Sequence, residues 1–151
     1  MTATSTLRAG HIGLNVTDLK RSLAFYGEVL GFDVLGEGDE DGRRFAYLGQ
    51  DGRLTLTLWQ QAAGVYAPGL AGLHHLAWEA GTVDEVKAFE ARLRERGTDF
   101  AYDGFAAHGE GATSGGIFFH DPDGTRLEIC VPTGADGAPI PVADAPTCGF
   151  F

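Results

Sequence analysis

The chain has 151 residues, of which 44% are hydrophobic and 21% charged, so its length and composition predict one ordinary globular domain. Its formal net charge of −10 argues against a nucleic-acid or membrane-surface partner, because phosphate groups are bound by clustered Lys and Arg. No apolar run could span a bilayer, residues 1–6 lack the pattern of a signal peptide, and two cysteines make no disulfide framework, so a cytoplasmic protein is expected.

A short motif occurs twice in the chain, each time as a histidine at the head of a mostly apolar run. The two histidines, His11 and His75, are 64 residues apart, and Phe25 and Phe89 in the segments that follow show the same spacing. This repeat is longer than that of a solenoid, so it indicates two copies of one supersecondary unit.

The first half of the chain predicts one strand, one helix and three further strands. Residues 8–16 alternate in polarity as a half-buried strand does, and apolar side chains after Asp18 recur at helical spacing until Gly31. An acidic turn is expected at 36–42 and a hairpin turn at Asp51-Gly52. The predicted elements are a strand at 8–16, a helix at 19–30, and strands at 32–35, 44–48 and 54–59.

The second half repeats this order. Thr82 and Glu85 form the pattern of a capping box, and Gly97 is a natural end for the helix that they open. We therefore expect an α+β fold of two βαβββ modules in tandem. The predicted elements are strands at 73–80 and 100–102, a loop at 104–116, and hairpin strands at 117–120 and 126–131; the modules cover about 8–60 and 72–131, with a linker at 61–71 and a C-terminal tail at 132–151.

The alternation of the strands predicts which side chains share the face opposite the helices. The apolar neighbours of Glu128 take the buried side, so Glu128 points to the open side, where His11 and His75 also project. A carboxylate there is costly unless it is paired or bound to a metal. Two histidines and one carboxylate on one face of an ion are typical of non-haem iron(II) sites. His74, one residue out of phase, is expected outside this ligand set, at the helix side or the strand edge.

Several motifs resemble those of the vicinal oxygen chelate superfamily, which includes glyoxalase I, bleomycin-resistance proteins, fosfomycin-resistance enzymes and type I extradiol dioxygenases. The resemblance covers roughly residues 8–131 and implies that the two modules form a cupped mixed β-sheet. It also implies metal ligands at His11, His75 and Glu128, and a homodimer. The matching motifs are His11-Ile12-Gly13-Leu14-Asn15-Val16-Thr17-Asp18-Leu19, Ser22-Leu23-Ala24-Phe25-Tyr26, Leu30-Gly31-Phe32, His75, and Asp121-Pro122-Asp123-Gly124-Thr125-Arg126-Leu127-Glu128.

Two departures from the family pattern bear on the reaction. Glyoxalase I carries a fourth ligand, a glutamate on the last strand of its first module, and strand alternation here places Thr55 at that position. Extradiol dioxygenases and fosfomycin-resistance enzymes often carry a tyrosine three residues before the Asp-Pro, where this chain has Phe118. A glyoxalase I mechanism therefore lacks one ligand, although water could replace it, and ring cleavage lacks one familiar hydrogen-bonding group.

Further side chains are candidates for proton transfer or for contact with a substrate. His120 and His108 are candidate acid–base residues, although a surface histidine beside a turn or in a glycine-rich loop has the same sequence context. The residues expected to line the pocket are Thr55, Thr57, Trp59 and Phe118, and core packing would explain Trp59 equally well.

Three functions are compatible with these observations. The first is an Fe(II) ring-cleaving dioxygenase that acts on a small catechol-like molecule, with the tail's Phe150 and other aromatic residues suited to a flat substrate. The second is a glyoxalase-like lyase or isomerase, or a hydrolase, that uses Mn, Zn or Ni as a Lewis acid. The third is a drug-binding protein of the bleomycin-resistance type, which the metal triad disfavours. We expect one divalent ion per chain, with Fe(II) favoured over the other metals.

Overall fold

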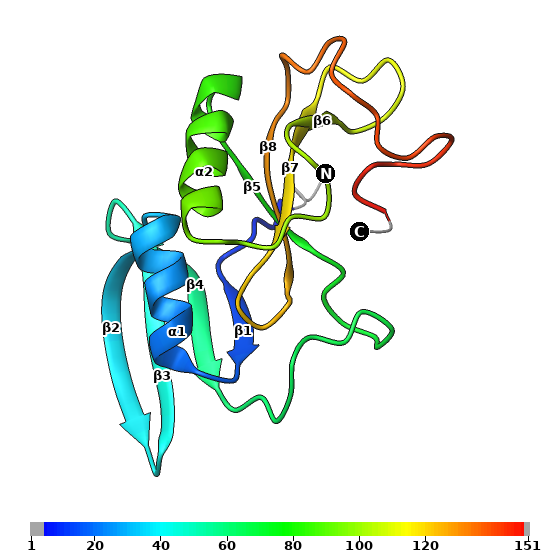
Figure 1. Ribbon diagram of the computed structural model, residues 1–151. Coiled ribbons are helices and arrows are strands. Elements are labelled where there is room, and N and C mark those ends of the chain that lie inside the picture. The colour runs from blue at the N-terminus through cyan, green and yellow to red at the C-terminus, as the bar shows by residue number, and fades with distance from the viewer. Residues whose placement is uncertain (1–4, 150–151) are drawn as a thin grey trace. The chain divides into compact units, whose positions relative to one another are not determined.

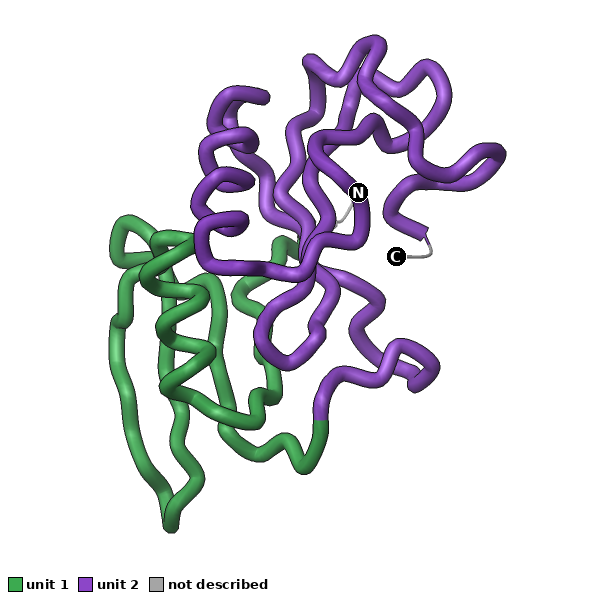
Figure 2. The backbone as a smooth tube through the Cα atoms, viewed as in Figure 1, with its two compact units in different colours: residues 1–64 green, residues 65–151 purple. Residues whose placement is uncertain are grey.

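The computed structural model describes residues 5–149, which fall into two compact units, one within 1–64 and the other within 65–151 (Figures 1 and 2). Each unit has a four-stranded mixed sheet, and in each the chain runs through a strand, a helical segment and three strands. The predicted α+β class and the two βαβββ modules are thereby confirmed. Within residues 5–149, no helix is long and apolar enough to cross a membrane.

The first unit is built on a sheet of strand order β1-β4-β3-β2, in which β1 is parallel to β4. Asp18 caps the helical segment by accepting a hydrogen bond from the Arg21 amide at 3.0 Å. Val16, Leu19 and Tyr26 are almost fully buried, so the helical segment and the sheet share one core. The elements are β1 (Ile12–Val16), α1 (Leu19–Leu23), a π-helical continuation η1 (Ala24–Val29), β2 (Asp33–Glu40), β3 (Arg43–Gln50) and β4 (Arg53–Gln60).

The acidic segment that was expected to form a turn at 36–42 is instead mostly strand. It continues β2 as far as Glu40, which pairs with Arg43, and only Asp41 and Gly42 turn, with φ of 53° and 80°. Gly38 allows this because its missing side chain leaves room for the ring of Phe45, which would lie 2.3 Å from a Cβ there. The hairpin turn predicted between β3 and β4 is confirmed, since Asp51 and Gly52 have φ of 50° and 73°.

The second unit repeats this topology with the strand order β5-β8-β7-β6, and β5 is parallel to β8. The predicted capping box is present, because Thr82 accepts from the Glu85 amide while the Glu85 carboxylate accepts from the Thr82 amide. Helix α2 contacts β7 and β8 and buries Val86 and Leu93 (Figure 1). The elements are β5 (Leu76–Glu79), α2 (Val83–Glu95), β6 (Ala106–Ala107), β7 (Gly115–His120) and β8 (Arg126–Val131).

Two details of the second unit differ from the sequence prediction. Residues 100–102 form no strand but a single bridge, from Phe100 to Phe119. The predicted loop instead contains β6, which pairs with Gly115 and Gly116 at the start of β7. Both glycines are needed there, since a Cβ on either would lie 2.4 Å from a backbone oxygen of a neighbouring strand. Close backbone approach, which polarity patterns do not reveal, therefore sets these boundaries.

Candidate metal centre

Glu128 is a buried carboxylate in the middle of β8. It lies between Phe118 on β7 and Ala77 on β5, and it is only 2% exposed. Its neighbours Leu127 and Ile129 are also buried, and strand alternation turns them to the other face of the sheet. A carboxylate removed from water in this way needs compensating partners, and histidine side chains supply them here.

His75 precedes β5 by one residue and is half-buried beside this carboxylate. Its Nε2 lies 3.6 Å from Glu128 Oε2, which is too long for a hydrogen bond. Two atoms that bind the same ion at about 2.0–2.2 Å lie about 3–3.5 Å apart, so this separation fits a pair of metal ligands. Burial lowers the pKa of His75 below its usual value, although the charge of Glu128 opposes the shift. The imidazole is therefore neutral at pH 7, as a metal ligand must be.

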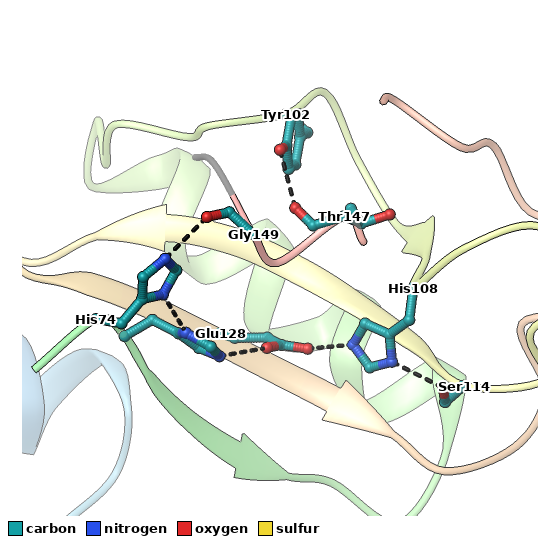
Figure 3. Close-up of polar contacts among 8 residues, drawn as sticks. His74, Tyr102, His108, Ser114, Glu128, Thr147 and Gly149 are labelled. Atoms are coloured by element: carbon teal, nitrogen blue, oxygen red, sulfur yellow. Dashed lines mark hydrogen bonds and ion pairs between the residues drawn. The ribbon is translucent and has the colours of Figure 1, made fainter. Parts of the chain in front are cut away.

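His108 contacts the other oxygen of the same carboxylate. Its Nε2 meets Glu128 Oε1, and its Nδ1 lies 2.8 Å from the Ser114 hydroxyl (Figure 3). Because a carboxylate only accepts, His108 donates through Nε2, and the Ser114 hydroxyl, which can donate or accept, partners its Nδ1. The loop between β6 and β7 holds both residues, since the His108 amide donates to the Ser114 carbonyl at 3.0 Å. One oxygen of Glu128 is thus held by His108 while the other faces His75.

His74 also belongs to this cluster, on the far side of His75. Its Nδ1 lies 2.8 Å from His75 Nδ1, and its Nε2 lies 2.8 Å from the carbonyl oxygen of Gly149 (Figure 3). The sequence predicted His74 at the helix side or the strand edge. In the structure it precedes the edge strand β5 and lies against the His75 nitrogen that faces away from Glu128.

The C-terminal segment 147–149 is hydrogen-bonded to His74 and to the chain around His108. Thr147 is fully buried, and its hydroxyl donates to the Ala107 carbonyl at 2.5 Å while its amide donates to the His108 carbonyl at 2.9 Å. The Thr147 carbonyl accepts from the Tyr102 hydroxyl at 2.9 Å. Neither Thr147 nor Ser114 stands out in the sequence, because their roles depend on the path of the chain. Phe150, expected to contact the substrate, lies outside the described residues.

Phe118 and His120 lie further along β7. Phe118 is fully buried, with its ring centroid 5.4 Å from that of Tyr102 and 6.1 Å from that of His108. Phe118, which is paired with Glu128 across the strands, therefore packs against Tyr102 and His108 beside the polar cluster. His120 Nδ1 lies 2.9 Å from the exposed carboxylate of Asp99, a different partner from the carboxylate that His108 contacts. The structure thus brings His108, rather than His120, to Glu128.

His11 stands in the first unit where His75 stands in the second, one residue before the first strand. It is exposed and lines a surface hollow of about 520 Å³ together with Thr55. The registers also correct one sequence assignment. Ile12 pairs with Leu56, as Leu76 pairs with Leu127 in the second unit, so the counterpart of Glu128 is Thr57 and not Thr55. Neither threonine can supply the carboxylate of a fourth ligand.

Thr57 and Trp59 lie on one face of the first sheet, beside the rings of Phe45 and Tyr47 on the neighbouring strand. The indole nitrogen of Trp59 donates to the Thr57 hydroxyl at 3.0 Å, and its ring stacks on Phe45 at 5.3 Å between centroids. Tyr47 completes the group, and both Tyr47 and Trp59 are 37% exposed. Trp59 is therefore not simply a core residue.

The donor atoms of the second unit fit one divalent ion only in part. Among the described residues of each unit, no three His, Cys, Asp or Glu side chains are arranged to hold an ion. The reason is visible in the second unit, where His75 and His108 approach different oxygens of Glu128. His75 and Glu128 therefore offer two donor atoms at a separation that suits one ion, and the described residues of this unit offer no third.

Comparisons of sequence and of structure with known proteins lead to the same superfamily. The model of the Glyoxalase/Bleomycin resistance protein/Dioxygenase superfamily matches residues 8–129. A catechol-2,3-dioxygenase of Bacillus subtilis (strain 168) is 36% identical over 123 residues, which are 80% of this chain but only 40% of that protein. A trivalent organoarsenical cleaving enzyme of Bacillus sp. (strain MD1) is 28% identical over 82% of this chain and 72% of its own length. A domain of the same superfamily from Frankia sp. EAN1pec superposes with a TM-score of 0.74 at 25% identity, covering 85% of this chain and 93% of that one.

Proposed function

The chain belongs to the Glyoxalase/Bleomycin resistance protein/Dioxygenase superfamily, and we propose that it is a metal-dependent enzyme of this family, specifically an Fe(II) dioxygenase that cleaves a small catechol-like ring. The dioxygenase activity is supported by the 36% identity to a catechol-2,3-dioxygenase. This chain spans less than half of that relative, so its substrate and reaction are part of the proposal.

The observation that carries the proposal is the pairing of His75 Nε2 with a Glu128 oxygen at 3.6 Å in a site where Glu128 is 2% exposed. We propose His11 as the third ligand, supplied by the same chain or by a second copy. Two histidines and one carboxylate leave positions on the ion open for other molecules. Fe(II) is the favoured metal, with Mn, Zn or Ni as alternatives.

The side chains around the carboxylate have distinct roles in this proposal. A bound ferrous ion would supply Lewis acidity toward the two oxygens of the substrate and the redox chemistry that ring cleavage requires. His108 holds a proton at Nε2, next to Glu128, and is the leading candidate for proton transfer; His120, beside Asp99, is the second. Phe118 and Tyr102 exclude water from the sheet side. Thr55, Thr57 and Trp59 are proposed to contact the substrate.

A second candidate function is a Lewis-acid reaction such as that of a lyase or an isomerase. The specific observation in its favour is the likeness to the glyoxalase I of Leishmania major, which superposes with a TM-score of 0.60 at 26% identity and covers 82% of this chain. The same His75–Glu128 pair would serve, because a divalent ion can polarise a substrate oxygen without changing its oxidation state.

The test is anaerobic loading with one equivalent of Fe(II), followed by oxygen uptake with a panel of catechols. We expect stoichiometric metal, oxygen consumption and a yellow ring-opened product. Glu128→Gln should abolish both metal binding and uptake, whereas Glu95→Gln makes the same chemical change at the exposed end of α2 and should affect neither. Verified iron loading without oxygen uptake would favour the Lewis-acid reaction. Binding of a cationic drug without any metal would instead indicate a sequestering protein.

A further inference from the structure

A continuous line of hydrogen bonds joins the C-terminal segment to His75. The carbonyl oxygen of Gly149 lies 2.8 Å from His74 Nε2, and His74 Nδ1 lies 2.8 Å from His75 Nδ1 (Figure 3). A backbone carbonyl can only accept a hydrogen bond, so the hydrogen of this contact must be on His74 Nε2. The position of one hydrogen atom is thereby determined by the chain's own backbone.

The tautomer of the next ring follows from this assignment. In its neutral form His74 carries a single N–H, so with the hydrogen on Nε2 its Nδ1 has a lone pair and accepts from His75 Nδ1. His75 therefore carries its hydrogen on Nδ1 and presents the lone pair of Nε2 toward Glu128. We propose that His74 is a positioning residue that fixes the metal-binding tautomer of His75, and that the Gly149 carbonyl makes the C-terminal segment part of the metal site.

This inference rests on the proposed metal site, and it gives a role to two parts of the chain that the site does not otherwise use. In a solvated histidine the Nε2–H form ordinarily predominates, and that form has no lone pair to offer from Nε2. The second ring nitrogen of a metal-binding histidine commonly donates to a carboxylate, a carbonyl or water, which fixes its orientation. Here the acceptor of that hydrogen bond is the imidazole of His74.

The C-terminal segment is held firmly enough to act in this way. Two residues before Gly149, the fully buried Thr147 bonds the carbonyls of Ala107 and His108 and accepts from Tyr102. The segment thus connects the backbone of His108, which contacts one oxygen of Glu128, with the ring of His74, which backs the histidine facing the other oxygen. Because Thr147 is already immobilised, ordering Gly149 against His74 costs little further conformational entropy.

The first experiment uses ¹⁵N NMR of the imidazoles in the metal-free protein at neutral pH, so it needs neither metal nor activity. In the wild-type protein we expect His75 to be protonated at Nδ1 and unprotonated at Nε2. His74→Phe removes the acceptor and should shift His75 to the Nε2–H form. His74→Asn is the matched control, because its amide oxygen can accept from His75 Nδ1 in place of the imidazole nitrogen, and it should preserve the wild-type tautomer.

The second experiment asks whether the C-terminal segment acts through His74. A chain that ends at Pro146 lacks the Gly149 carbonyl and should shift His75 as His74→Phe does, whereas a chain that ends at Phe150 keeps that carbonyl and should not. In a His74→Asn background, shortening the chain to Pro146 should leave His75 unchanged. Thermal unfolding of each variant verifies that it is folded.

The consequence for the metal is measured separately by titration with Co(II). His74→Phe should bind about 10–100-fold more weakly than wild type, with His74→Asn close to wild type. An Nε2–H tautomer of His75 in the wild-type protein, or an unchanged Nδ1–H tautomer in His74→Phe, would overturn the inference. Absence of oxygen uptake would count against the proposed dioxygenase activity but not against the role of His74, because the NMR measurement does not depend on activity.

Discussion

Replacing Glu128 by Gln should separate the contribution of this carboxylate to metal binding from its contribution to the stability of the fold. The side chain keeps its size, and its amide oxygen can still accept the hydrogen bond from His108 Nε2. The amide nitrogen of the glutamine would take the place of Oε2, which lies 3.6 Å from His75 Nε2. That distance is too long for a hydrogen bond, so no close contact is lost. What disappears is a negative charge at a position that is 2% exposed.

The expected effect on the metal-free protein is therefore a gain in stability. His75 is neutral at pH 7 because burial lowers its pKa, so it provides no positive charge that would compensate the carboxylate. Burying a charge without an opposite charge carries a desolvation cost of several kcal/mol, and even whole buried ion pairs can often be replaced by apolar residues of similar volume with a change between about 0 and a gain of 4 kcal/mol. Since Gln still carries polar atoms that need partners, we expect the free energy of unfolding to rise by about 1 kcal/mol.

The effect of metal should be the opposite. An ion present at 100 times its dissociation constant stabilises a folded protein by about 2.7 kcal/mol, and this increment should be present in the wild type and absent from Glu128→Gln. The assay is urea denaturation of both proteins with and without Co(II), with Glu95→Gln as the control. If metal-free Glu128→Gln were less stable than wild type by more than about 1 kcal/mol, the carboxylate would be part of a structural ion pair with His108, and the reasoning would be refuted.

Five further predictions concern the ligands, the assembly, the Cys130 thiol and the core. His75→Ala should abolish stoichiometric metal, while His74→Ala should retain one ion per chain at saturating metal; equal losses by elemental analysis would contradict the assigned ligands. The protein should sediment as a homodimer, and a monomer across the working concentrations would contradict the family expectation. Burial raises the pKa of the Cys130 thiol to about 11, so its alkylation at pH 8 should be at least about tenfold slower than in the urea-unfolded chain. Because that pKa is raised on folding, the stabilisation is present below about pH 9 and is lost as pH rises through 11, so urea midpoints should fall over that range. Phe118→Ala should cost about 3–5 kcal/mol, since its ring is fully buried; a loss below about 1 kcal/mol in urea denaturation would mean that the site collapses without cost.

The sequence by itself determined the order of the elements and the face of the second sheet on which Glu128 lies. These features are local or periodic. Thr82 and Glu85 form the capping box from residues three positions apart, and the two-residue period of β8 turns Glu128 away from its apolar neighbours. The 64-residue spacing of His11 and His75 similarly revealed the duplication without any knowledge of contacts.

The tertiary structure decided which side chains meet. Strand pairing showed that Thr57, not Thr55, is the counterpart of Glu128, because register depends on partners that alternation within one strand cannot identify. The contact of His108 with Glu128 depends on how the β6–β7 loop folds back over the sheet. The bond from His74 to Gly149 joins residues 75 positions apart, and it exists because Thr147 anchors the end of the chain beside the site. Contacts of this kind arise from the path of the backbone in space, which no pattern of polarity along the chain encodes.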